Sequence, residues 1–131
     1  MAIRIEANAV TFANDAYSTL LAFAEDPPNP RRYVTLALTN SPDDRDVALG
    51  MEDVHIEAGD LKIDGYDLVA GLSLSGRSLT IKLEREAAAA AGMDDEIEII
   101  LDSGAIGEVP LAEAVRAFEK RIAARSRPRT G

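Results

Sequence analysis

The sequence predicts an α+β fold, with an antiparallel β-sheet and two helices, a short one and a longer C-terminal one, packed on one face. Apolar residues alternate with polar ones in a series of short segments, which is the pattern of strands with one buried face. Helical signals are confined to two late segments, residues 84–91 and 110–124. The strands follow one another with too few intervening helices for parallel crossovers, so an antiparallel sheet is expected.

Four strands are predicted in the first half of the chain, at residues 3–6, 17–24, 33–39 and 53–58. In the third, Val34, Leu36 and Leu38 fall on one face because successive side chains of a strand point to opposite faces. The fourth repeats this pattern, with His55 and Glu57 on the face opposite its apolar residues. Three prolines, at positions 27, 28 and 30, break the chain between the second and third strands.

A hairpin, two helices and one further strand are predicted in the second half. The hairpin joins residues 66–75 to 78–83 through Gly76-Arg77, because glycine suits the first central position of a type II′ turn. Consecutive alanines favour the helix at 84–91, and Gly92 ends it. Residues 96–102 return to strand. The last helix carries one apolar stripe at helical spacing, formed by Leu111, Val115, Phe118 and Ile122.

The size and composition of the chain indicate one independently folding domain. It has 131 residues, of which 47% are hydrophobic, and a chain of this size buries about two-thirds of its unfolded surface. We expect a single domain over residues 1–124 and a basic, disordered tail over 125–131. No apolar run approaches the roughly 20 residues that span a bilayer, no signal peptide is recognisable, and cysteine is absent. A cytoplasmic location is therefore expected.

The residues required by common catalytic and metal sites are missing. A single histidine and no cysteine exclude a Cys/His zinc site and a cysteine nucleophile. The motif His55-Ile56-Glu57 matches half of a zinc deaminase signature, but its paired cysteines are absent. The aspartates at 43, 44 and 46 do not continue into the spacing of a calcium-binding EF-hand. With no phosphate-binding glycine motif either, we predict no enzyme activity, no cofactor and no metal.

Negative charge is the most informative remaining feature. The net charge is −9, and residues 43–67 hold nine acidic residues against Arg45 and Lys62. Residues 94–102 hold five more acids and no base. Strand acids alternate with the core positions, so we expect both segments in one sheet to present a broad acidic surface. Such a surface is either ordinary solvated exterior or a docking site for a basic partner, and it disfavours nucleic acid.

The most specific sequence stretch is Leu49-Gly50-Met51-Glu52-Asp53-Val54-His55-Ile56-Glu57. An aspartate-rich loop, Leu-Gly-Met, an acid and a strand containing histidine and glutamate follow one another there. This order resembles immunity protein family 10 of bacterial polymorphic toxin systems. The resemblance extends over residues 17–122, through the hairpin, the alanine helix, the acidic strand and the C-terminal helix.

The resemblance implies a cytoplasmic, non-catalytic protein that binds and neutralises a cognate toxin. The acidic surface favours a basic toxin and neither nucleic acid nor membrane as the partner. The candidate partner-binding residues are Asp43, Asp44, Asp46, Glu52, Asp53, His55, Glu57, Glu96 and Glu98. The alternative is a non-catalytic ligand-binding module or a structural homodimer, joined through a sheet edge or the last helix.

Overall fold

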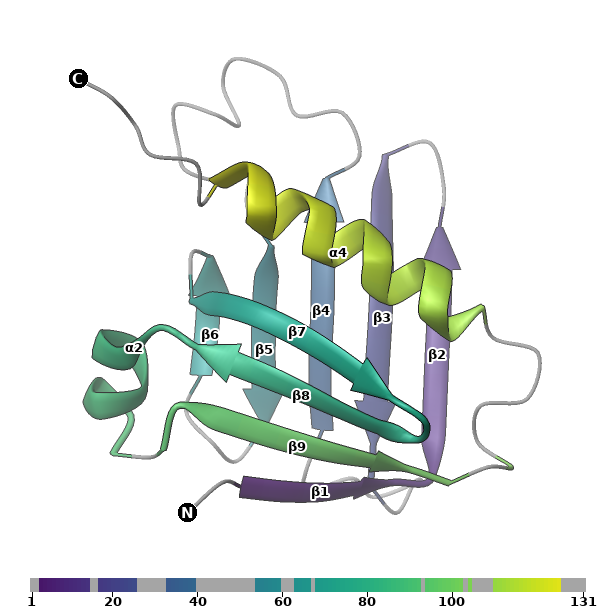
Figure 1. The fold of residues 1–131 in the computed structure, drawn as a ribbon, viewed down its shortest axis with the longest axis horizontal. Coiled ribbons are helices and arrows are strands. Elements are labelled where there is room, and N and C mark those ends of the chain that lie inside the picture. Colours follow the sequence, from purple (N-terminus) through teal and green to yellow (C-terminus); the bar gives the residue numbers. More distant parts are fainter. Residues whose placement is uncertain are drawn as a thin grey trace.

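The fold is described from a computed structural model. The structure describes residues 3–14, 17–25, 33–39, 54–59, 63–66, 68–92, 94–102, 104 and 110–125. Within them, nine strands form two sheets. Sheet A has the order β1-β9-β8-β7, and sheet B has the order β2-β3-β4-β5-β6. Figure 1 shows the strands of sheet A crossing those of sheet B at a steep angle.

The strands of sheet A are β1 (Ile3–Ala7), β7 (Val69–Ser75), β8 (Ser78–Leu83) and β9 (Glu96–Leu101). Those of sheet B are β2 (Ala9–Asn14), β3 (Ser18–Ala24), β4 (Tyr33–Thr39), β5 (His55–Gly59) and β6 (Ile63–Tyr66). All neighbours pair antiparallel except β1 and β9, which are parallel.

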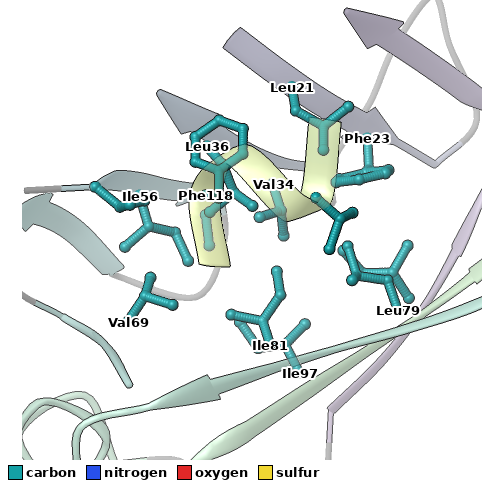
Figure 2. Close-up of a cluster of buried hydrophobic side chains, with 14 of the residues drawn as sticks. Leu21, Phe23, Val34, Leu36, Ile56, Val69, Leu79, Ile81, Ile97 and Phe118 are labelled. Carbon is teal, nitrogen blue, oxygen red and sulfur yellow. The ribbon is translucent and has the colours of Figure 1, made fainter. Parts of the chain in front are cut away.

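The hydrophobic core fills the space between the two sheets. Strands of both sheets alternate between buried and more exposed residues, and the buried ones form a single cluster. Leu21, Phe23 and Leu36 from sheet B meet Leu79 and Ile81 from sheet A in this layer (Figure 2). Each sheet therefore has one face in the core and one face pointing away from it.

A sharp bend at Asn8 connects the two sheets. β1 belongs to sheet A, β2 belongs to sheet B, and only Asn8 separates them. Its amide donates to the carbonyl oxygen of Ala24 at 2.9 Å, and Ala7 beside it is fully buried. Orthogonally packed sheets are commonly joined at such corners, where one strand passes from one sheet to the other.

The helix α4 (Leu111–Arg125) completes the layer that contains sheet A. It packs against β7 and lies across sheet B (Figure 1). Its predicted apolar stripe is buried, and Phe118 belongs to the same hydrophobic core as Leu36 (Figure 2). Nη2 of Arg121 also donates to the carbonyl oxygen of Thr39 at 2.9 Å, which ties α4 to the end of β4.

The short helix α2 (Arg85–Ala90) lies at the end of β8 (Figure 1). Ala88 is its only buried residue. Gly92 follows with a φ of 70°, a left-handed conformation that glycine adopts at little cost. The helix and its end were therefore predicted correctly, but α2 does not share the position of α4 over sheet B.

The α+β class and the inward residues are confirmed, whereas the single antiparallel sheet is wrong. The chain forms two sheets, one of which contains a parallel pair. β2 and β6 were not predicted. Alternation identifies which residues of a strand face a core, but it carries no information about which sheet the strand joins. The bend at Asn8 has neither proline nor glycine to mark it.

Candidate interaction surface

The predicted acidic residues that the structure describes do not form one surface. Glu57 lies on β5 of sheet B, while Glu96 and Glu98 lie on β9 of sheet A. Their neighbours along each strand are buried in the shared core, so the acids point outward on opposite sides of the molecule. The expectation of a broad acidic face across both strands is therefore wrong. Asp43, Asp44, Asp46, Glu52 and Asp53 lie outside the described residues.

The outer face of sheet A has mixed charge. Nη2 of Arg4 on β1 contacts Oε1 of Glu98 at 3.3 Å. Lys82 on β8 lies directly opposite Glu96 in the strand register. The two candidate acids on β9 thus have basic neighbours within their own sheet, which reduces the field that they present to a partner.

The outer face of sheet B carries a different set of side chains at β4, β5 and β6. Directly paired residues of antiparallel strands share a face, and Tyr33 pairs with Gly59, Glu57 with Asp64, and His55 with Tyr66. These five side chains therefore lie on one surface, which we call the His–Tyr face: Tyr33, His55, Glu57, Asp64 and Tyr66.

Tyr33 is positioned by a glycine on the neighbouring strand. Its ring lies over Gly59, where an added Cβ would clash with the ring carbon Cε1. In this position the phenol donates a hydrogen bond to Oε1 of Glu57 at 3.2 Å. The carboxylate of Glu57 raises the pKa of Tyr33 above its ordinary 10.0, first by its charge and then through the hydrogen bond. Burial and Asp64 act in the same direction.

His55 connects the other two residues of the His–Tyr face. Its Nε2 lies 3.0 Å from Oδ1 of Asp64, an ion pair when the imidazole is protonated. Its ring also meets Tyr66 edge to face, with centroids 4.8 Å apart. The carboxylates of Glu57 and Asp64 belong to directly opposite residues, a placement that is unfavourable for like charges. Tyr33 donates a hydrogen bond to the carboxylate of Glu57, and His55 contacts the carboxylate of Asp64.

Sequence reasoning identified two of these five residues, His55 and Glu57. Tyr33 was placed in a strand, with an alternation that put it on the face away from Val34. Asp64 was missed because its strand, β6, was not predicted, and Tyr66 was wrongly assigned to the first arm of the hairpin, at 66–75. The alternation Ile63-Asp64-Gly65-Tyr66 is only four residues long, and its glycine weakens the strand signal.

Two features are absent from the described residues, a cluster of metal-binding side chains and a membrane-spanning helix. No group of three or more histidine and acidic side chains in these ranges could hold a metal ion. No helix there is both long and apolar enough to cross a membrane. The His–Tyr face presents hydrogen-bonding, charged and aromatic groups on a β-sheet.

The chain matches a known protein family over most of its length. The family model for immunity protein 10 matches residues 6–108, more than three-quarters of the chain. The match contains strands β2 to β9 and all of the His–Tyr face, whereas α4 follows it. No curated protein matches the chain. Because the family model covers most of its length, the chain belongs to the immunity protein 10 family.

Proposed function

We propose that this protein binds and neutralises a cognate bacterial toxin in the cytoplasm, without catalysis and without a cofactor. Its family membership supports an immunity function and implies a toxin as the partner. The observation that carries the proposed binding site is the His–Tyr face, where two carboxylates lie opposite each other among tyrosine and histidine rings.

The chemistry of this face favours a basic partner surface. A lysine or arginine of the toxin placed between Glu57 and Asp64 would relieve the repulsion between their directly opposed carboxylates. Tyr33 and Tyr66 add large, rigid contact groups of the kind that dominate interface energies. These residues sit on a sheet, so little ordering is required when a partner binds.

The sequence between β4 and β5 adds charge next to this site along the chain. Five of our candidate residues fall there, namely Asp43, Asp44, Asp46, Glu52 and Asp53. We propose that they steer a basic toxin toward His55 and Glu57 by long-range attraction. Glu96 and Glu98, on the opposite face, are a second candidate surface that experiment can separate from the first.

We expect the cognate toxin to be encoded beside this gene, and co-expression of the two proteins tests the proposed function. The wild-type protein should co-purify with the toxic domain and protect cells that express it. The double variant Glu57→Lys with Asp64→Lys should lose at least about tenfold in affinity, because it places positive charge against a basic surface. The matched variant Glu96→Lys with Glu98→Lys should retain binding and protection.

Two results would count against the proposal. If the wild-type protein neither binds the toxin nor protects cells, neutralisation of that toxin is wrong. If only the variant at positions 96 and 98 loses binding, neutralisation stands and the interface lies on sheet A.

A further inference from the structure

The four edge strands of the two sheets are protected to different degrees. An exposed edge presents unpaired backbone groups that can pair with another chain, so proteins cover edges, charge them or keep them short. In sheet A, β7 packs against α4. β1 is charged, and the amide of Glu6 donates to Oε2 of Glu25 at 3.1 Å. In sheet B, β6 has only four residues and includes Asp64.

The remaining edge, β2, has none of these protections among the described residues. All six residues of Ala9–Asn14 pair with β3, so the strand is regular along its whole length. It contains no charge and no proline, and its sequence is Ala-Val-Thr-Phe-Ala-Asn. In the described part of the chain no strand pairs with its other side. A straight, uncharged edge of this length is a template for strand addition.

The absence of charge extends well beyond this edge. None of the residues of β2, β3 and β4 is acidic or basic, although the chain as a whole has a net charge of −9. Sheet B therefore has an uncharged half at β2 to β4 and an acidic edge at β5 and β6. The electrostatic repulsion between two copies of this acidic protein is weakest when they meet through such an uncharged edge.

We propose that β2 is a homodimer interface, in which the β2 strands of two copies pair antiparallel across a two-fold axis. A two-fold axis perpendicular to the sheet places the core-facing sides of both copies on the same side of the joint sheet. Core-facing residues of one copy then pair with core-facing residues of the other, and outward residues pair with outward residues. Pairing Thr11 with Thr11 of the second copy then sets Val10 opposite Phe12 and Ala9 opposite Ala13. The result is one continuous sheet through both subunits.

The sequence of β2 is complementary to itself in this pairing, so the strand that pairs with it is β2 of a second copy. Val10 and Phe12 are half-buried against the core of their own subunit, and in the dimer they would extend that apolar layer. Thr11 and its counterpart are exposed, and threonine pairs are favourable across strands. A single strand pair buries less area than a standard stable interface of about 1,600 Å². We therefore expect a reversible dimer that leaves the His–Tyr face free at the far edge.

Analytical ultracentrifugation of the full chain across a concentration series tests this proposal. The wild-type protein should show a monomer–dimer equilibrium. Thr11→Lys should raise the dissociation constant at least about tenfold, because two lysines would lie directly opposite each other. Mixing Thr11→Lys with Thr11→Glu should restore dimers as heterodimers. Ala13→Lys provides a second edge variant, and Thr80→Lys on β8 is the control that should dimerise normally.

Circular dichroism melting establishes that each variant is folded. Each outcome of the sedimentation experiment then has one interpretation. A wild-type chain that stays monomeric up to about 1 mM would overturn the proposal. Dimers that persist unchanged in both edge variants would also overturn it. If the wild type is monomeric and edge variants lose toxin binding instead, the occupant of β2 is a toxin strand and not a second copy.

Discussion

Tyr33 and Gly59 show how one missing side chain organises the His–Tyr face. The ring of Tyr33 occupies the space above Gly59 that any other residue would fill. An aromatic ring over a cross-strand glycine is a recognised way to stabilise that weak position in a sheet. The same placement brings the phenol within hydrogen-bonding distance of Glu57, so a packing contact sets the chemistry of the surface.

The raised pKa of Tyr33 gives a prediction about pH. Glu57→Gln should lower that pKa toward 10.0, because it removes the negative charge that is the main cause of the shift. In the wild type, the folded pKa exceeds the unfolded one. The stabilising contribution is therefore complete below about pH 10 and is lost as pH rises through the folded value. Titration of ¹³C-labelled tyrosine by NMR checks the pKa, and urea denaturation at a series of pH values checks the effect on stability.

Gly59→Ala provides a second variant for the same prediction. The new methyl group would force the Tyr33 ring aside and break its hydrogen bond to Glu57, so the pKa of Tyr33 should again fall. An unchanged pKa in both variants would contradict the described contact between Tyr33 and Glu57.

At the scale of elements, α4 is integral to the fold although it lies outside the matched family region. Phe118 is fully buried in the core between the sheets (Figure 2). Phe118→Ala should lower the free energy of unfolding by about 3–5 kcal/mol, measured by urea denaturation. Its exposed neighbour is the control, and Glu119→Ala should change stability by less than about 0.5 kcal/mol. Equal effects of the two would mean that α4 does not pack as described.

Local sequence patterns predict some of these elements and not others. The regular strand β4 and the stripe of α4 follow from residue spacing, because each is long enough to repeat its period. β2 was missed because Val10 and Phe12 are followed by small and polar residues without clear alternation. The parallel pairing of β1 with β9 joins residues almost a hundred positions apart in the chain, so no local pattern could have predicted it.

At the scale of the whole molecule, the two crossed sheets decide which charges can act together. His55 and Glu57 were predicted as partner-binding residues from their place on an outward strand face. Their neighbours Tyr33, Asp64 and Tyr66 join them only through the pairing of β4, β5 and β6. Glu96 and Glu98 were grouped with them by charge and by the expectation of a single sheet, and the two-sheet fold separates them. Charge composition thus suggested the kind of partner. The residues that form the surface could be identified only from the order of strands in the sheet.

The kinetics of toxin binding test the proposed interface most directly. We predict that Asp43→Lys, Asp44→Lys and Asp46→Lys combined will slow association at least about tenfold at low salt and flatten its dependence on ionic strength. Glu57→Lys with Asp64→Lys should mainly speed dissociation. Glu96→Lys with Glu98→Lys should leave both rates within about twofold of the wild type. Unchanged rates in the first two variants, with slower association in the third, would contradict binding at the His–Tyr face.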